Sequence, residues 1–424
     1  MPRFATPTLI MALAVYLLLS LGACSEGSAP NGSKVSDSPS KVDLRRARAA
    51  FERGSAQVQE HLETPDHETL RAAIDFLEES VRLAPDEIQH RLMAGRTQEL
   101  ALNSEAALAH YRVATGLGHE DPLVWRRMGN LALGLGDLDL ARGCFERALS
   151  RQADDPELFF GYGCLLDLEE DLQGARQAFD AAIAIRPTYD DAYFRLAKVL
   201  RGLGDEVGAD AARAEFDHWH GVDRNLTEAR KQVRMHPEDA QGVRAVGLYL
   251  FQLQRAEECT DWLQRAKKML PRDAIVLECL GRAQSGLGQI PAARANLELA
   301  VECAPGSVDP LRELAFVLAK GGDAEGALER MAQALALAPG DADLHFQNGV
   351  LLMQLQRPDA ALKAYALALV NDPDFIDAHL GQAEVHYGAN RREEAIAAYR
   401  RVLAIDPTSA AATGSLNFIL GEGK

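Results

Sequence analysis

The sequence predicts an all-α protein built of stacked helix-turn-helix repeats. Prolines recur at positions 271, 305, 339, 373 and 407, each 34 residues after the previous one. Alanines at 293, 327, 361 and 395 keep a constant distance from these prolines. Between them, apolar residues fall three and four positions apart, which is the spacing of an amphipathic helix. A fixed period of this length indicates a repeat protein in which each unit packs on its neighbours.

The unit that closes at Pro373 carries Gly349, Ala361, Tyr365 and Ala368. Small residues allow two helices to approach closely, a tyrosine fills the space beside them, and proline favours the start of a helix. This pattern resembles the tetratricopeptide repeat, in which each unit is a pair of antiparallel helices. The resemblance covers residues 54–409 and implies a right-handed α-solenoid of about ten repeats. It also implies that the protein binds other proteins or peptides in a concave groove.

The N-terminus has the features of a signal peptide over residues 1–23. Arg3 precedes an apolar run from Leu9 to Leu21, which is shorter than the roughly 20 residues that span a bilayer as a helix. Residues 21–24, Leu-Gly-Ala-Cys, resemble a bacterial lipobox, which implies export, cleavage before Cys24 and lipidation of its thiol. An ordinary signal peptide with an incidental Cys24 is the alternative. We therefore expect a lipid-anchored protein of the bacterial cell envelope, in the outer membrane facing the periplasm rather than in the inner membrane.

The rest of the chain divides into a tether and two arrays of repeats. Residues 24–41 follow the signal peptide and are rich in Ser, Gly and Pro, which predicts a flexible linker. The repeats occupy residues 42–223 and 240–409, and residues 410–424 form a capping helix and tail. Sixteen residues, 224–239, interrupt the period and are predicted to form one short extra helix that acts as a joint. A long loop without mechanical consequence is the alternative.

Composition and motifs argue against nucleic acid binding and give no sign of catalysis. The net charge is −17, whereas phosphate binding requires a basic surface. The sequence contains no phosphate-binding glycine loop, paired-cysteine metal motif or nucleophile elbow, so we predict no enzymatic activity and no cofactor. His218, His220 and His236 are the one histidine cluster, and a metal site there is the alternative to solvated histidines beside a packed Trp219.

The cysteines after Cys24 are odd in number, so at least one of them is unpaired. Two pairs share a spacing of 20 residues that places them on helices expected to pack together, where a disulfide requires Cα atoms within about 7 Å. Buried free thiols that pack as small apolar residues are the favoured interpretation. The cysteines are Cys144, Cys164, Cys259, Cys279 and Cys303.

The candidate binding surface is the inner face of the first helix of each unit, which the resemblance places in the groove. This face is enriched in arginine and aromatic residues, the types that anchor interfaces. Arg126 and Asn130 partly resemble the carboxylate clamp of chaperone-binding repeats, but Gly161 and Asp191 depart from it. The candidates are Arg126, Arg127, Asn130, Phe160, Phe194, Arg195, Lys198 and Arg201, then Arg244, Phe251, Arg282, Arg312, Phe316, Lys320, Phe346, Met353 and Tyr387.

We predict that the part between Arg126 and Arg201 binds an acidic or C-terminal peptide. The competing interpretation is that these arginines only pair with Asp and Glu of adjoining helices. At the level of function, we expect a membrane-tethered scaffold for assembly of an envelope, secretion or pilus complex. The alternatives are an accessory subunit of a polysaccharide or cell-wall pathway, and an unrecognised enzyme or metal-binding protein. The sequence does not reveal the oligomeric state.

Overall fold

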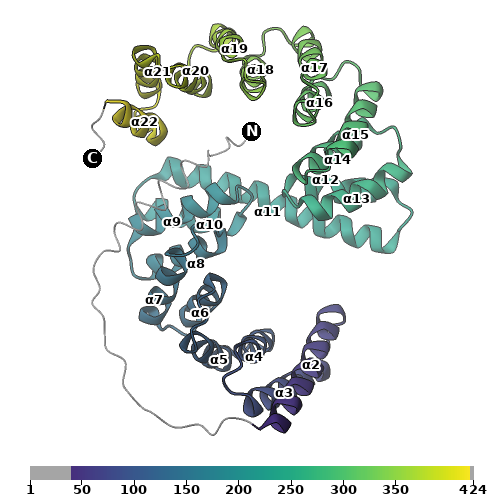
Figure 1. The fold of residues 1–424 in the computed structure, drawn as a ribbon, viewed down its shortest axis with the longest axis vertical. Coiled ribbons are helices and arrows are strands. Elements are labelled where there is room, and N and C mark those ends of the chain that lie inside the picture. Colours follow the sequence, from purple (N-terminus) through teal and green to yellow (C-terminus); the bar gives the residue numbers. More distant parts are fainter. Residues whose placement is uncertain (1–39, 421–424) are drawn as a thin grey trace. The chain divides into compact units, whose positions relative to one another are not determined.

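The fold is described here from a computed structural model, which covers residues 40–420 (Figure 1). Over this range the elements are helices arranged in successive pairs, with no strand, so the predicted all-α repeat architecture is confirmed. None of these helices is both long enough and apolar enough to cross a bilayer. The predicted signal peptide, the lipidation site at Cys24 and residues 25–39 of the linker lie outside the described residues.

The described chain forms two compact units that divide between Phe216 and Asp217. In the first unit, first helices begin 34 residues apart at residues 88, 122, 156 and 190. The pairs are α2 (Lys41–Glu63) with α3 (His67–Leu83), α4 (Ile88–Leu100) with α5 (Ser104–Gly116), α6 (Pro122–Gly134) with α7 (Leu138–Leu149), and α8 (Pro156–Leu168) with α9 (Leu172–Ile185), followed by α10 (Asp190–Gly202).

The second unit keeps the same step, with first helices that begin at residues 240, 274, 308, 342 and 376. Each is followed by a second helix, and α22 comes after the last pair. The elements are α12 (Ala240–Gln252), α13 (Ala256–Met269), α14 (Ala274–Gly286), α15 (Ile290–Cys303), α16 (Val308–Lys320), α17 (Ala324–Leu337), α18 (Ala342–Gln354), α19 (Pro358–Asn371), α20 (Ile376–Gly388), α21 (Arg392–Ile405) and α22 (Ala410–Leu420).

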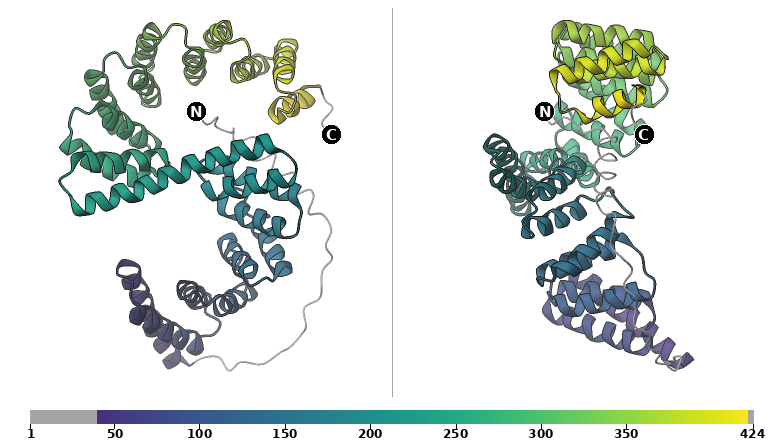
Figure 2. Two further views of the ribbon diagram at one scale, coloured as in Figure 1. Left: turned by 180° about the vertical axis from the view of Figure 1, so that it is seen from behind. Right: turned by 90° about the vertical axis from the view of Figure 1, so that its left-hand side faces the viewer.

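The interruption of the period is one long helix, α11 (Glu206–Met235) of 30 residues, rather than a separate short helix over 224–239 (Figure 2). The sequence is consistent with this difference, because no proline occurs between Glu206 and Pro237. Trp219, Val222, Leu226 and Val233 are all buried and keep helical spacing through the expected boundary at residue 223. The second helix of the unit at 190–223 therefore continues through the extra residues.

Glycine and an aromatic ring form the crossing of the two helices in several repeats. A Cβ atom on Gly129 would lie 2.6 Å from Cε1 of Phe145, and one on Gly349 would lie 2.3 Å from Cε1 of Tyr365. Both rings are buried. The eighth residue of these units is therefore glycine because the ring at the twenty-fourth residue occupies the space of its side chain.

The turn inside each helix pair from α4 onward contains a residue in the left-handed region. This residue has φ between 57° and 85° at positions 34 residues apart, in both units. Glycine adopts this conformation without strain, whereas other L-residues pay for it. The positions are Leu102, Gly136, Glu170 and Gly204 in the first unit, and Gln254, Gly288, Gly322, Gln356 and Asn390 in the second.

Candidate functional site

Arg126, the first candidate of the predicted groove, is held by carboxylates of the next repeat. Its Nη1 donates to Oδ1 of Asp155 at 2.8 Å and to Oε2 of Glu157 at 3.1 Å. The Arg126 side chain is only 17% exposed. Asp155 also caps α8, because its Oδ1 accepts from the backbone N–H groups of Glu157 and Leu158. Arg126 therefore couples α6 to the start of α8.

A second arginine completes this cluster between repeats. Arg186 donates to Glu157 from the end of α9. Burial alone would raise the pKa of Glu157, but the hydrogen bonds from Arg186 and Asp155 outweigh it and lower the pKa to about 2. Burial raises the pKa of Asp155, and its hydrogen bond with Glu157 acts in the same direction. The two acids and two arginines thus pair with one another inside the junction, although Nε of Arg126 is buried without a hydrogen-bond partner.

The predicted arginines of the second unit also have partners within the chain. Nε of Arg244 donates to Oδ2 of Asp273 at 2.8 Å, across two successive first helices. Arg282 and Arg312 both lie near Glu313, at 3.6 Å and 3.1 Å. In the first unit, Arg127 donates to Glu99 of the preceding repeat in the same manner. The competing interpretation from sequence, in which arginines pair with acids of adjoining helices, therefore describes Arg126, Arg127, Arg244 and Arg282. Arg312 pairs instead with Asp309 and Glu313 of its own helix.

The predicted aromatic residues mostly pack between repeats as well. The ring of Phe160 lies 5.0 Å from that of Tyr189, and the ring of Phe346 lies 5.3 Å from that of Phe375. Phe316 packs against a hydrophobic core of the second compact unit. Four other predicted residues also have contacts. Asn130 lies against Gly161, Phe251 lies under the Arg282 guanidinium, Lys320 donates to Oγ of Ser285 at 3.4 Å, and Tyr387 contacts Phe418 of α22.

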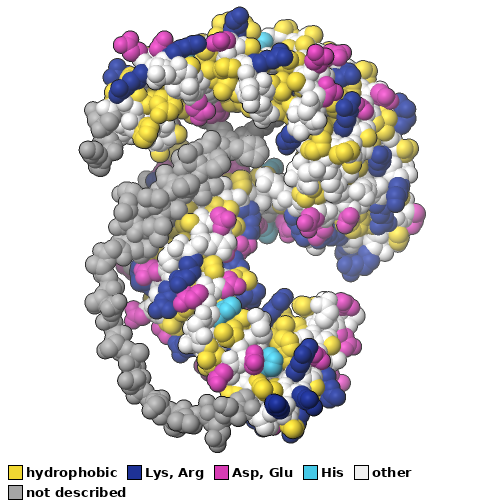
Figure 3. Space-filling model, viewed as in Figure 1, with side chains coloured by type: hydrophobic (Ala, Val, Ile, Leu, Met, Phe, Trp, Pro, Cys, Tyr) yellow, Lys and Arg dark blue, Asp and Glu magenta, His cyan; other side chains and the backbone are white. Residues whose placement is uncertain are grey.

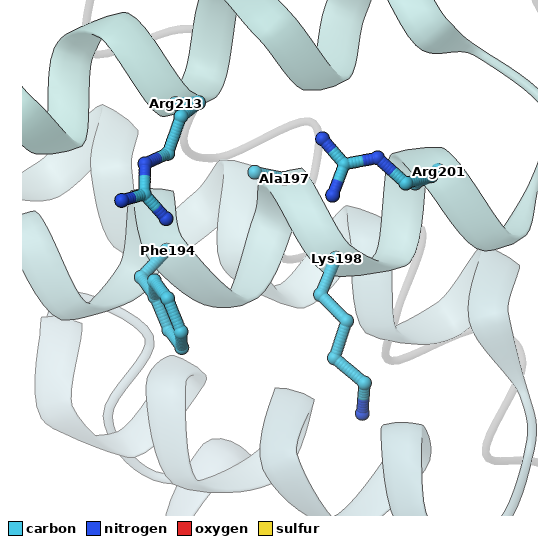
Figure 4. Close-up of a pocket in the computed structure, with 5 residues that line it drawn as sticks. All are labelled: Phe194, Ala197, Lys198, Arg201 and Arg213. Carbon is cyan, nitrogen blue, oxygen red and sulfur yellow. The ribbon is translucent and has the colours of Figure 1, made fainter.

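The end of the first unit differs, because there the predicted residues line a cavity. Phe194, Lys198 and Arg201 project from α10, and together with Ala197 and Arg213 they enclose about 380 Å³ (Figure 4). Phe194 is 45% exposed, and the side chains of Lys198 and Arg201 are 63% and 57% exposed. Arg195 lies on the same helix and is exposed, but it does not line the cavity. This is where the sequence-predicted basic and aromatic residues come together.

The cavity carries three cations beside an aromatic ring. The guanidinium groups of Arg201 and Arg213 lie on either side of Ala197 in Figure 4. Nζ of Lys198 lies 2.9 Å from Oδ2 of Asp167, whereas the contacts of Arg201 with Glu206 and Asp210 are long, at 3.6 Å and 4.0 Å. Both Arg201 pairs are solvent-exposed, and such pairs contribute little and exchange readily for other partners. The cavity can therefore bind a carboxylate and an apolar side chain together.

Arg213 was missing from the residues predicted to bind, although the sequence holds a signal for it. The twenty-fourth residue is aromatic in other units of this array, at Tyr111, Phe145 and Phe179, and is arginine only in the unit at 190–223. The guanidinium of Arg213 lies 5.9 Å from the ring centre of Phe194 and 5.0 Å from that of Phe216. Elsewhere on the face seen in Figure 3, basic and acidic side chains are interspersed.

The five cysteines of the described chain are free thiols. Burial raises the pKa of Cys144 to about 11, and it raises the pKa values of Cys259 and Cys279 to about 12. A thiol with such a pKa stays protonated at neutral pH and is a poor nucleophile and metal ligand. These residues therefore act as small apolar side chains in the helix packing.

The histidine cluster gives no support to a metal site. His218 and His220 are exposed on α11 on either side of buried Trp219, and the ring of His218 packs edge-on against the indole at 4.6 Å. His236 follows the end of α11, and its Nδ1 lies 3.7 Å from Oε1 of Glu238. Over residues 40–420, no three or more His, Cys, Asp or Glu side chains are grouped to hold a metal ion.

Comparison with known proteins agrees with the repeat architecture. A family model described as tetratricopeptide repeat matches residues 126–190, 312–374 and 346–410. Human tetratricopeptide repeat protein 8 is 30% identical over 118 residues, which are 27% of this chain and 21% of the human protein. The match thus spans about a fifth of that relative's length.

Solved structures with similar backbones include three of different extent. Yeast Tom70 is 14% identical, with a TM-score of 0.38 over 89% of this chain and 95% of Tom70. The Cut9–Hcn1 structure is 11% identical, with a TM-score of 0.40 over 91% of this chain and 94% of that one. YrrB, described as a TPR protein with an unusual peptide-binding site, is 21% identical, with a TM-score of 0.35 over 44% of this chain and 96% of YrrB. The helix pairs, their period and the family match show that this chain is built of tetratricopeptide repeats.

Proposed function

We propose that this protein is a membrane-tethered scaffold that binds acidic segments of partner proteins during assembly of an envelope, secretion or pilus complex. Tetratricopeptide repeats are a protein-binding architecture, which gives the general function of scaffold or adaptor. The observation that carries the finer proposal is the cavity of Phe194, Lys198, Arg201 and Arg213, which three cationic side chains and one exposed ring line together. A basic site of this kind in a chain of net charge −17 favours an acidic ligand.

The proposed tether is the N-terminal segment. The lipobox-like residues 21–24 support lipidation of Cys24, and each buried CH₂ of an acyl chain adds about 0.8 kcal/mol of membrane affinity. The linker, which ends where α2 begins at Lys41, would then hold the repeats roughly 20–25 Å from the membrane surface on average. Such a scaffold acts close to the bilayer without lying on it.

Membrane tethering is tested by Cys24→Ser in the full chain, expressed in a bacterium. We expect the unchanged chain to incorporate radiolabelled palmitate and to sediment with membranes, and the variant to lose both properties. A variant that still sediments with membranes and is released only by detergent would overturn the lipid anchor. Equal labelling of both chains would overturn the assignment of Cys24.

Partner binding is tested by reversing charge at Lys198 and Arg201, because Arg126 is occupied by Asp155 and Glu157. The double variant Lys198→Glu/Arg201→Glu should lose specific partners in a pull-down from membrane extract. The matched control is Arg48→Glu/Arg82→Glu, which changes the net charge equally at two exposed side chains of other helices. An identical partner profile for the two double variants, both with unchanged helix content, would contradict the proposal.

A further inference from the structure

The cavity at α10 lies where the first helix of the next repeat packs in regular units. Its lining residues are the fifth, eighth, ninth, twelfth and twenty-fourth of the unit at 190–223. In the unit at 122–155, the corresponding fifth, ninth and twenty-fourth residues contact α8, the next first helix. The cavity is therefore a vacant seat for a helix and not a generic surface depression.

Two regular junctions show how that helix sits. A Cβ atom on Gly161, the sixth residue of its unit, would lie 2.6 Å from Oδ1 of Asn130 and 3.0 Å from Cε1 of Phe145. A Cβ atom on Gly381, again a sixth residue, would lie 2.8 Å from Cζ of Tyr365. The sixth residue of an incoming helix thus rests on the twenty-fourth residue of the preceding unit and reaches its ninth residue.

No such helix follows α10, because α11 runs on to Met235 without the turn that would start the next repeat. The effect on exposure is visible at the fifth position. The Arg126 side chain is 17% exposed under α8, whereas Phe194 is 45% exposed. At the twenty-fourth position, Phe145 is fully buried and Arg213 is exposed. The seat is therefore open in this structure and is lined with charge.

The regular junctions also show which residue type meets the fifth position. The partner is the residue just before the next first helix, 29 residues further along the chain, and it is of complementary type. Arginine meets aspartate in two junctions, and ring meets ring in two others. The pairs are Arg126 with Asp155, Arg244 with Asp273, Phe160 with Tyr189, and Phe346 with Phe375. Phe194 therefore favours an aromatic residue just before the first turn of an incoming helix.

The remaining lining residues define a second requirement on the incoming helix. It concerns the residue six positions after the aromatic one. In regular junctions the ninth and twelfth residues reach the sixth and ninth residues of the next helix, as Arg282 reaches Glu313 and Asp167 reaches Lys198. At the vacant seat these positions are Lys198 and Arg201, and Arg213 takes the place of the ring under the sixth residue. A carboxylate at the sixth residue of an incoming helix would therefore meet Lys198 and Arg213, whereas Arg201 would reach the ninth residue.

We propose that the seat formed by Phe194, Lys198, Arg201 and Arg213 accepts a helix of a partner protein that completes the missing repeat. This helix has an aromatic residue immediately before its first turn and a glutamate or aspartate six residues after that aromatic residue. The inference rests on the proposed function as a binder of acidic partner segments, and it adds the conformation and the spacing of the ligand. A helix laid into a groove is read through such fixed side-chain intervals.

A peptide cut from this chain itself provides the probe. Residues 373–388 contain Phe375 just before α20 and Gly381 six residues later, so Gly381→Glu creates the proposed ligand in one step. Fluorescence anisotropy measures binding of the labelled peptide to the full chain. We expect the Glu peptide to bind at least about tenfold more tightly than the Gly or Lys peptides. Phe375→Ala in the Glu peptide should remove most of this gain.

Variants of the protein provide the complementary arm. Arg201→Glu/Arg213→Glu should reverse the preference, so that the Gly381→Lys peptide binds more tightly than the Glu peptide. The Arg48→Glu/Arg82→Glu control should keep the original order, and circular dichroism should show equal helix content for all three proteins. Restored binding upon exchange of charges between ligand and seat separates recognition from a general effect of net charge.

Two outcomes would overturn the inference. One is equal affinity for the Glu, Gly and Lys peptides, which overturns the helix ligand even if the pull-down still depends on Lys198 and Arg201. The other is a dimer, measured by analytical ultracentrifugation, that dissociates in the Arg201→Glu/Arg213→Glu variant, because the seat would then hold a second copy of this chain. If Lys198→Glu/Arg201→Glu leaves the pull-down unchanged, that result contradicts the proposed function. The peptide affinities then decide the inference about the helix ligand.

Discussion

Nη1 of Arg126 lies 2.8 Å from Oδ1 of Asp155, and this contact joins the fifth residue of one repeat to the residue that begins the next helix pair. The same step of 29 residues joins Arg244 to Asp273 in the second unit. Asp155 and Asp273 also cap α8 and α14. One side chain therefore caps the N-terminus of a helix and also binds the preceding repeat, which links local structure to the stability of neighbouring repeats.

Arg126→Ala should destabilise the first unit by about 2 kcal/mol, because it leaves the partly buried Asp155 without its cation. Chemical denaturation followed by circular dichroism measures this free energy. The control is Arg151→Ala, whose pair with Glu120 is more exposed and should contribute less than about 1 kcal/mol. Equal losses for the two variants would show that the Arg126 contact does not couple the repeats.

Gly349→Ala should destabilise the second unit by about 1–3 kcal/mol, because the new Cβ would collide with the Tyr365 ring. Another repeat of the chain accommodates alanine at this position, since Ala315 and Met331 occupy the same two positions in the unit at 308–341. In the background Tyr365→Met, the alanine should therefore cost much less. Additive losses in this double-mutant cycle would argue against the collision as the cause.

The sequence could predict the helix pairs because the 34-residue period is carried by residues, such as Gly349 and Tyr365, that contact each other inside one unit. It could not assign the groove arginines. The partner of Arg126 is 29 residues away, and whether a candidate faces a carboxylate or solvent depends on how successive repeats stack. Helix α11 was mistaken for two elements because a break in the period was taken as a break in the helix. That break is also what leaves Phe194 and Lys198 exposed.

Leu102→Gly should stabilise the first unit by about 0.5–1 kcal/mol. Leu102 adopts φ of 60°, where a side chain is strained, and it is 89% exposed, so its removal sacrifices almost no buried surface. Thermal unfolding measures the gain. Gly136→Ala is the reciprocal control at the same turn of the next repeat, with φ of 78°, and should cost about 1 kcal/mol. A destabilised Leu102→Gly variant would indicate a contact that outweighs backbone strain.

Glu278 is the fifth residue of the repeat at 274–307, a position that is acidic in no other repeat. We expect this carboxyl group to make the free energy of unfolding depend on pH. Burial raises the pKa of Glu278 above its ordinary 4.5. The negative charges of Asp309 and Glu313 raise this pKa further, whereas the positive charge of Arg282 lowers it. A raised folded-state pKa contributes stability that is fully present below 4.5 and is lost as pH rises through the folded value. The buried charge of Glu278 therefore destabilises the unchanged chain at pH 7.

Glu278→Gln removes that charge while Arg282 keeps Glu313 as a partner. We expect the variant to unfold at a higher temperature than the unchanged chain at pH 7, and the difference to disappear below about pH 4, where Glu278 is protonated. Calorimetry across this range measures the effect, and Glu52→Gln, at an exposed site, serves as the control. A variant that is less stable at pH 7 would show instead that the 3.5 Å ion pair between Glu278 and Arg282 outweighs the burial of the carboxylate.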